Sequence, residues 1–129
     1  MGRPSLIVAG AAVLVAAGVP FQFTAAAQTK PDGGTLYKQR CQACHQITAG
    51  KASPTGPNLY GVVNRKAASA PVPFNYSAAL KKSGLTWTRA NLDKYLTAPT
   101  KMVPGTKMVI AMPNAAQRAA IIDYLARNK

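Results

Sequence analysis

The sequence predicts an all-α domain with long loops, and three observations lead to this prediction. Apolar residues recur at helical spacing in several short segments, the alternating pattern of strands is weak throughout, and stretches containing Pro and Gly separate the segments. The chain has 129 residues, a length that fits one domain and excludes a multidomain enzyme. We therefore expect one helical domain behind an amino-terminal segment of different character.

The amino-terminal segment has the pattern of a signal peptide rather than of a folded element. Arg3 gives it a positive start, residues 6–19 are an unbroken run of apolar and small residues, and residues 25–27 are the small residues that a signal peptidase recognises. We predict a signal peptide over 1–27, cleavage before Gln28, and export of residues 28–129 to the bacterial periplasm. The alternative is an uncleaved helix that anchors the domain in the membrane, facing the periplasm.

Four segments of the exported part carry the apolar spacing and the end signals of helices. In chain order they are 32–44, 77–83, 88–98 and a last helix that starts at Asn114. Asp32 is placed to cap the first, Gly84 to end the second, and Asn114 to cap the last. The last helix is the clearest, because Ile121, Ile122 and Leu125 form an apolar stripe. Residues 50–70 have no sustained period and predict an extended loop.

These helices supply little apolar core, because the loops outweigh them. Small domains of this kind usually need a disulfide, a metal or another covalent or bound group to be stable. We therefore expect that a large apolar body absent from the sequence completes the core.

Residues 41–45, Cys-Gln-Ala-Cys-His, contain both cysteines and the one histidine of the chain. This C-x-x-C-H pattern is typical of covalent attachment of a c-type haem. Thiols three residues apart lie on the same face of a helix, so Cys41 and Cys44 can reach the two vinyl groups along one edge of a porphyrin. His45 can then turn under the ring and ligate the iron, for which neutral imidazole is well suited. The haem would be the missing apolar body.

Three other interpretations of the motif compete with haem attachment. A disulfide between Cys41 and Cys44 would close a very small loop and stabilise little. A thioredoxin-like redox pair would need a surrounding βαβ pattern, which the sequence lacks. A structural zinc site would need four ligands, whereas two Cys and one His are present. Haem attachment is therefore the favoured interpretation.

The second iron ligand is expected to be a methionine, which raises the reduction potential of a His-ligated haem and suits electron transfer. The candidates beyond the signal peptide are Met102, Met108 and Met112. Any one of them could simply fill the core. Met108 follows a Pro104-Gly105 turn that can present it inward from a loop, so we predict that it is the ligand. The Pro57 carbonyl is a candidate to accept a hydrogen bond from the other ring nitrogen of His45.

From Gly33 to about Leu125 the residues resemble those of the small class I c-type cytochromes, of the mitochondrial-like and bacterial periplasmic type. The joint spacing of C-x-x-C-H with Pro-Gly-Thr-Lys-Met at 104–108 makes the resemblance specific. It implies the cytochrome c fold, in which three to five helices and long loops surround one covalent haem c. It also implies that the first and last helices cross, with Gly33, Tyr37 and Tyr124 at the crossing.

The resemblance further implies roles for residues around the haem. The residues expected near the haem propionates are Arg65, Tyr76, Trp87 and Thr106. Pro57 and Tyr95 are expected beside the axial ligands His45 and Met108. Three positions depart from the family pattern: Leu80 stands for an Asn, Ile110 for an aromatic residue, and Asn64 for a Gly. These departures bear on the reduction potential and the partner rather than on the fold.

The function implied by the resemblance is one-electron transfer between membrane or periplasmic redox proteins, without enzymatic activity. The chain has 16 Lys and Arg against 3 Asp and Glu, a net charge of 16 − 3 = +13. We expect Lys side chains at the haem edge, Lys107 among them, to steer docking onto acidic surfaces. The expected partners are cytochrome oxidase, a bc1-like complex or a periplasmic dehydrogenase. We expect a monomer that touches the membrane only peripherally.

Two other function classes remain as alternatives. A haem enzyme or sensor, peroxidase-like or ligand-binding, would keep an open coordination site, which Met108 would close. A nucleic-acid-binding protein is suggested only by the sequence pI of about 10.3. The basic residues are scattered and lack the aromatic interleaving that stacks bases, so we expect no nucleic-acid binding.

Overall fold

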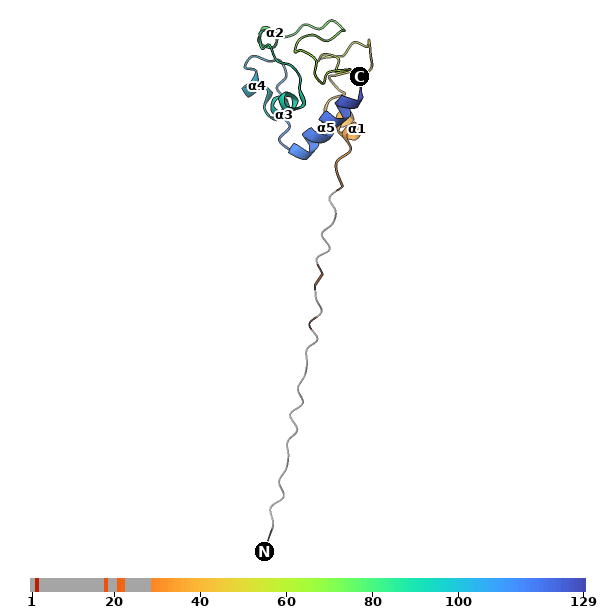
Figure 1. The fold of residues 1–129 in the computed structure, drawn as a ribbon, viewed down its shortest axis with the longest axis vertical. Helices are drawn as coiled ribbons and strands as arrows, with labels where there is room; N and C mark the ends of the chain where they lie inside the picture. Colours follow the sequence, from red (N-terminus) through yellow and green to blue (C-terminus); the bar gives the residue numbers. More distant parts are fainter. Residues whose placement is uncertain (1, 3–17, 19–20, 23–28) are drawn as a thin grey trace.

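The computed structural model describes residues 2, 18, 21–22 and 29–129. The predicted signal peptide, its cleavage site before Gln28 and the alternative anchor therefore fall almost wholly outside the described residues. Within the described ranges the regular structure consists of helices and one isolated bridge, without strands (Figure 1). The all-α prediction is confirmed. None of the helices in these ranges has the length and apolar character needed to cross a membrane.

The helices occupy the predicted segments, with one addition. They are α1 (Gly33–Arg40), α2 (Ala78–Lys82), α3 (Arg89–Thr97), α4 (Pro99–Met102) and α5 (Ala115–Arg127). α1 ends earlier than the predicted Cys44, because residues 41–44 form turns instead. The sequence pattern does not predict α4, because Pro99 reads there only as a stop for the preceding helix. Pro99 also begins α4, since the first position of a helix needs no backbone N–H donor.

Side-chain caps explain where the helices begin. The Asp32 carboxylate accepts a hydrogen bond from the Thr35 amide at 2.7 Å, and this bond holds the pKa of Asp32 below its ordinary value. Asn114 caps α5 in the same way, accepting from the Gln117 amide at 3.0 Å. Gly84 has a φ of 63°, the left-handed conformation expected after α2. The predicted caps are thus present in the structure.

The first and last helices cross, as the sequence predicts (Figure 1). A side chain at Gly33 would collide with the backbone carbonyl of Ala120, so only glycine permits this approach. The rings of Tyr37 and Tyr124 pack beside this contact with centroids 5.4 Å apart. The crossing brings the residues after α1, where the C-x-x-C-H motif lies, against the face of α5.

The long loop after α1 is fastened to the segment before α3 by backbone hydrogen bonds. The Asn64 amide donates to the Trp87 carbonyl at 2.9 Å, and the Trp87 amide donates to the Arg65 carbonyl at 2.8 Å. Asn64 has a φ of 67°, so it adopts the left-handed conformation that the glycine of the family pattern would adopt. Asn tolerates this conformation better than other side chains do, and the departure at Asn64 leaves the fold intact.

Candidate functional site

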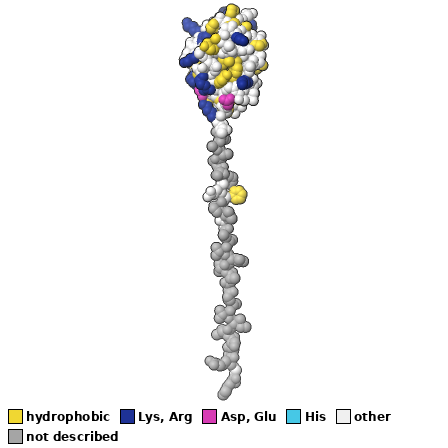
Figure 2. All heavy atoms as spheres, turned by 90° about the vertical axis from the view of Figure 1, so that its right-hand side faces the viewer, with side chains coloured by type: hydrophobic (Ala, Val, Ile, Leu, Met, Phe, Trp, Pro, Cys, Tyr) yellow, Lys and Arg dark blue, Asp and Glu magenta, His cyan; other side chains and the backbone are white. Residues whose placement is uncertain are grey.

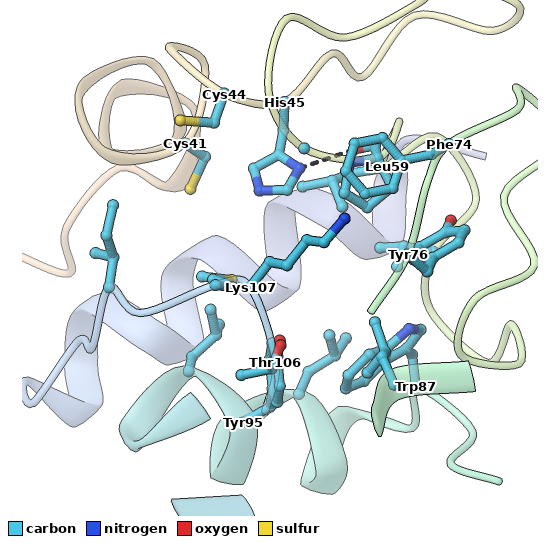
Figure 3. Close-up of a pocket in the computed structure, with 18 of the residues that line it drawn as sticks. Cys41, Cys44, His45, Leu59, Phe74, Tyr76, Trp87, Tyr95, Thr106 and Lys107 are labelled. Carbon is cyan, nitrogen blue, oxygen red and sulfur yellow. Dashed lines mark hydrogen bonds between the residues drawn. The ribbon is translucent and has the colours of Figure 1, made fainter. Parts of the chain in front are cut away.

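A cavity of about 400 Å³ lies inside the domain, with walls that are mainly apolar (Figure 3). Its size is within the range of pockets that hold cofactors. All of the residues predicted for the site line it: Cys41, Cys44, His45, Pro57, Arg65, Tyr76, Trp87, Tyr95, Thr106 and Met108. The structure therefore brings together residues that are up to 67 positions apart in the chain (108 − 41 = 67).

The two thiols enter the cavity from the turns that follow α1. The His45 amide donates to the Cys41 carbonyl at 2.9 Å, and the Cys44 amide donates to the same carbonyl at 3.0 Å. This compact turn places Cys41, Cys44 and His45 at one end of the cavity (Figure 3). Both thiols are free. Burial raises the pKa of Cys41 to about 11, so the thiol is protonated at neutral pH.

The imidazole of His45 is oriented by its surroundings. Nδ1 donates a hydrogen bond to the Pro57 carbonyl at 2.7 Å, the bond that the sequence analysis predicts, and leaves Nε2 as the lone-pair nitrogen. A side chain at Gly56 would collide with the imidazole ring. Burial lowers the pKa of His45, which favours the neutral form that ligates iron.

Tyr37 adds a contact to this end of the site that the sequence analysis missed. Its hydroxyl donates to the backbone carbonyl of His45 at 2.6 Å. Burial raises the pKa of Tyr37 to about 12, so the hydroxyl keeps its proton and remains a donor. The sequence analysis assigned Tyr37 only to the helix crossing. The signal that could have found the contact is the hydroxyl itself, since a buried Tyr usually finds a polar partner.

Residues 103–114, which we call the ligand strap, form another wall of the cavity. Met108 in the strap is half-buried and lines the cavity together with the buried Met112, whereas Met102 does not line it. The hydroxyls of Tyr95 and Thr106 are hydrogen-bonded at 2.5 Å. Figure 3 shows this pair across the cavity from His45. Of the three methionine candidates, Met102 lies in α4, whereas Met108 and Met112 both lie in the strap, Met108 half-buried and Met112 buried.

The side chain of Arg65 carries an unused hydrogen-bond donor. Its terminal nitrogens donate to the carbonyls of Tyr60 at 2.7 Å and Asn58 at 2.9 Å. Its Nε is the one buried side-chain nitrogen or oxygen atom of the described residues without a hydrogen-bond partner. A buried N–H of this kind requires an acceptor, and the carboxylate of a haem propionate would supply one.

These observations show that the residues fit a covalent haem. Two thiols, an imidazole with one free nitrogen and a thioether line one apolar cavity, and the half-buried Arg65 beside them has a buried Nε that still lacks an acceptor. Leu80, the departure from the family's Asn, is also buried against the cavity and makes its wall more apolar. Ile110, the other departure, is 57% exposed next to Val109 at the mouth.

The known proteins similar to this chain that are described below are all cytochromes of the c type. A family model described as "Cytochrome c" matches residues 31–129. Cytochrome c2 of Rhodoblastus acidophilus is 49% identical over 100 residues, covering 77% of this chain and 92% of that protein. Cytochrome c2 of Rhodomicrobium vannielii is 43% identical over 114 residues, covering 88% and 90%. The solved structure of cytochrome cH from Methylobacterium extorquens matches with a TM-score of 0.66 and 41% identity, covering 72% of this chain and 92% of that one.

Proposed function

This chain belongs to the cytochrome c family, whose members carry single electrons on one covalent haem c, and we propose that four of its residues hold this haem. Cys41 and Cys44 bind it through thioethers, and His45 and Met108 ligate its iron. The observation that carries this assignment is that these four side chains line one apolar cavity. The bound haem supplies the Fe(III)/Fe(II) couple, so the protein is an electron carrier rather than an enzyme.

In this proposal, the chain's own residues fix the ligands and keep water out. The Pro57 carbonyl orients His45 and makes its free nitrogen more basic. Tyr95 and Thr106 fix the strap just before Met108. The propionates are bound by Arg65, through its unpaired Nε, and by Tyr76, Trp87 and Thr106. A rigid apolar wall leaves few groups that must rearrange when the charge on the iron changes.

The charge distribution supports acidic redox partners. All three carboxylate side chains of the chain are occupied internally: Asp32 by the α1 cap, Asp93 by Arg118, and Asp123 by Lys30 and Arg89. Figure 2 shows Lys and Arg side chains gathered along one side of the domain and few acidic side chains. The positive charge is therefore free to attract an acidic surface. The proposed partners are cytochrome oxidase, a bc1-like complex or a periplasmic dehydrogenase.

The docking face is proposed to lie at the mouth of the cavity. Lys107 is exposed beside Met108, and Val109 and Ile110 are 71% and 57% exposed next to it. An apolar centre with a charged rim is the usual construction of a protein interface, and weak electron-transfer encounters bury little surface.

The protein is proposed to act in the bacterial periplasm as a monomer, after cleavage before Gln28.

Two measurements test these assignments. Intact mass of the exported protein is expected to equal residues 28–129, that is 129 − 27 = 102 residues, plus one haem. The ferric holoprotein is expected to show the weak long-wavelength absorption band of thioether–iron ligation, and Met108→Leu to abolish it, with Met102→Leu as the matched control. A band that survives in Met108→Leu would assign the ligand to another residue.

A kinetic experiment tests the docking face. The rate of reduction by an acidic partner is expected to fall between low and high ionic strength, because salt screens exposed charges. Lys107→Gln is expected to lower the rate at low salt more than Lys51→Gln, which makes the same charge change on a residue that does not line the cavity. Equal effects of the two substitutions would contradict the placement of the docking face at the cavity mouth.

A further inference from the structure

The ligand strap is weakly held by its own backbone at its centre. Residues 107–111 make no backbone–backbone hydrogen bond within the described structure. On the amino-terminal side the Thr106 amide donates to the Val103 carbonyl at 3.0 Å, and on the carboxyl-terminal side the Met112 amide donates to the Leu96 carbonyl at 2.7 Å. Met108 therefore lies on a short bridge between two anchored points. How firmly each point is anchored decides how firmly Met108 is held.

The carboxyl-terminal anchor depends on one buried side chain, that of Arg118 in α5. Its Nε donates to Asp93 in α3 at 2.7 Å, in an ion pair in which Arg118 is buried and Asp93 is half-exposed. One of its terminal nitrogens donates to the strap carbonyls of Met112 at 2.9 Å and Pro113 at 2.8 Å. A single guanidinium thus joins α3, α5 and the strap.

These bonds are costly to break and specific to a guanidinium. Moving the strap outward would leave the Arg118 donors and the Met112 carbonyl unpaired in a buried position. A planar guanidinium presents its Nε and terminal N–H groups in a fixed fork, whereas a lysine ammonium is a single point on a flexible stem. Lysine at this position would keep the charge but could not serve Asp93 and both strap carbonyls together.

We propose that Arg118 is a positioning residue for Met108: it anchors the carboxyl-terminal end of the ligand strap and thereby sets how rarely the thioether leaves the iron. This inference rests on the proposed ligation by Met108. An external ligand such as imidazole can bind the iron only when Met108 has left, so its apparent affinity rises with the fraction of molecules in which the strap is displaced. Weakening the anchor must therefore tighten imidazole binding.

The test is imidazole binding to the ferric holoprotein in three variants, followed by absorption. Arg118→Lys is expected to bind imidazole about tenfold more tightly than the wild type, because it loses hydrogen bonds made by a charged group. Asp93→Asn keeps an oxygen acceptor for Nε and loses the charge, so an intermediate gain of about threefold is expected. Arg89→Lys, in the exposed pair with Asp123, does not touch the strap and is expected to match the wild type.

A second readout separates a positioning role from a general loss of stability. Amide hydrogen exchange is expected to speed up at 107–112 in Arg118→Lys and to stay unchanged at 41–45. Unchanged imidazole affinity and unchanged strap exchange in Arg118→Lys would overturn the proposal. If Arg118→Lys fails to fold, the Asp93→Asn variant tests the proposal instead. An imidazole affinity of Asp93→Asn equal to that of Arg89→Lys would overturn the proposal. Absence of the thioether–iron band from the wild type would instead overturn Met108 ligation itself, and the role of Arg118 with it.

Discussion

The segment that carries the attachment motif, residues 41–59, and the ligand strap, residues 103–114, are held in different ways. In the attachment segment backbone hydrogen bonds join residues that are distant in the chain, in addition to side-chain bonds such as that of Tyr37 to the His45 carbonyl. The Cys44 carbonyl accepts from the amides of Thr55 at 3.4 Å and Gly56 at 2.8 Å, and the Leu59 amide donates to the Gln46 carbonyl at 2.8 Å. The centre of the strap has no such bonds and is flanked by contacts to the side chains of Tyr95 and Arg118.

This difference separates a fixed side of the site from an adjustable one. Backbone hydrogen bonds survive most substitutions, so the geometry of His45 should respond less to the loss of one side chain than the geometry of Met108 does. Side-chain contacts can be removed one at a time, so the hold on Met108 can be graded. Under the proposed ligation, the covalent side stays constant while substitutions around the strap change how firmly Met108 is held.

The largest effect is expected when the covalent side is removed altogether. Cys41→Ala with Cys44→Ala should leave a cavity of about 400 Å³ without a haem. Its apolar walls would face water instead of the haem, and the lost burial is large against the about 5–15 kcal/mol of stability of a typical domain. We expect no cooperative thermal transition by circular dichroism. A haem-free double variant that is well folded would show that the haem does not complete the core.

The next largest effect is expected from a collision on the fixed side. Gly56→Ala should push its methyl group into the His45 ring and cost about 3 kcal/mol of unfolding free energy, with a changed ferric spectrum. Gly50→Ala is the matched control: its φ of 71° costs strain, but open space surrounds it, so the spectrum should stay unchanged. Equal spectra for the two variants would mean that the attachment segment yields more easily than its hydrogen bonds indicate.

A smaller effect is expected from removing one contact on the adjustable side. Tyr95→Phe deletes the hydrogen bond to Thr106 and should cost about 1 kcal/mol in denaturant unfolding. The thioether–iron band should shift, whereas the proton resonances of His45 should not. Proton resonances of His45 that shifted in Tyr95→Phe as strongly as the thioether–iron band would contradict the distinction between the two regions.

The smallest effect is expected from the exposed ion pairs of Asp123, which lie outside the attachment segment and the ligand strap. Contacts with Lys30 and Arg89 lower the pKa of Asp123 from 3.8 to about 2. A carboxylate whose pKa is lower in the folded state stabilises the fold above the unfolded pKa, and this contribution is lost as the pH falls from about 4 toward 2. Asp123→Asn should therefore remove part of the acid destabilisation seen in that window.

Salt is the control for the Asp123 prediction. At 1 M salt the screening length is about 3 Å, so wild type and Asp123→Asn should unfold alike across the same pH window. The buried contacts of Arg118 should be screened much less. An acid response of the wild type that is the same with and without salt would assign the destabilisation to other groups.

Much of the fold and of the site was predictable because the signals are local in sequence. The capping side chains of Asp32 and Asn114 lie within three residues of the amides that they cap, and C-x-x-C-H is a contiguous motif. Contacts between distant segments were not predictable in the same way. The Cys44 carbonyl, for example, accepts from the amides of Thr55 and Gly56 in the loop that follows.

Arg118 was missed although its position carries a signal. It stands three residues before Ile121 and seven before Leu125, on the apolar stripe of α5, where a lone charge predicts a buried partner. The sequence does not say which acid pairs with it, because Asp93 is 25 residues away and the pairing depends on how α3 packs on α5. Tertiary packing determines which charged residues pair, and local sequence patterns carry no information about that packing.

The crossing of α1 and α5 affects the order in which synthesis, haem attachment and folding can occur. These are the first and last helices of the described residues, so their contact cannot form until α5 has been synthesised. Synthesis proceeds from the amino terminus, and Cys41 and Cys44 therefore emerge more than 70 residues ahead of α5 (115 − 44 = 71). During that interval the thiols belong to an open chain. The topology thus leaves the reactive sulfur atoms accessible to attachment chemistry before the structure closes over them.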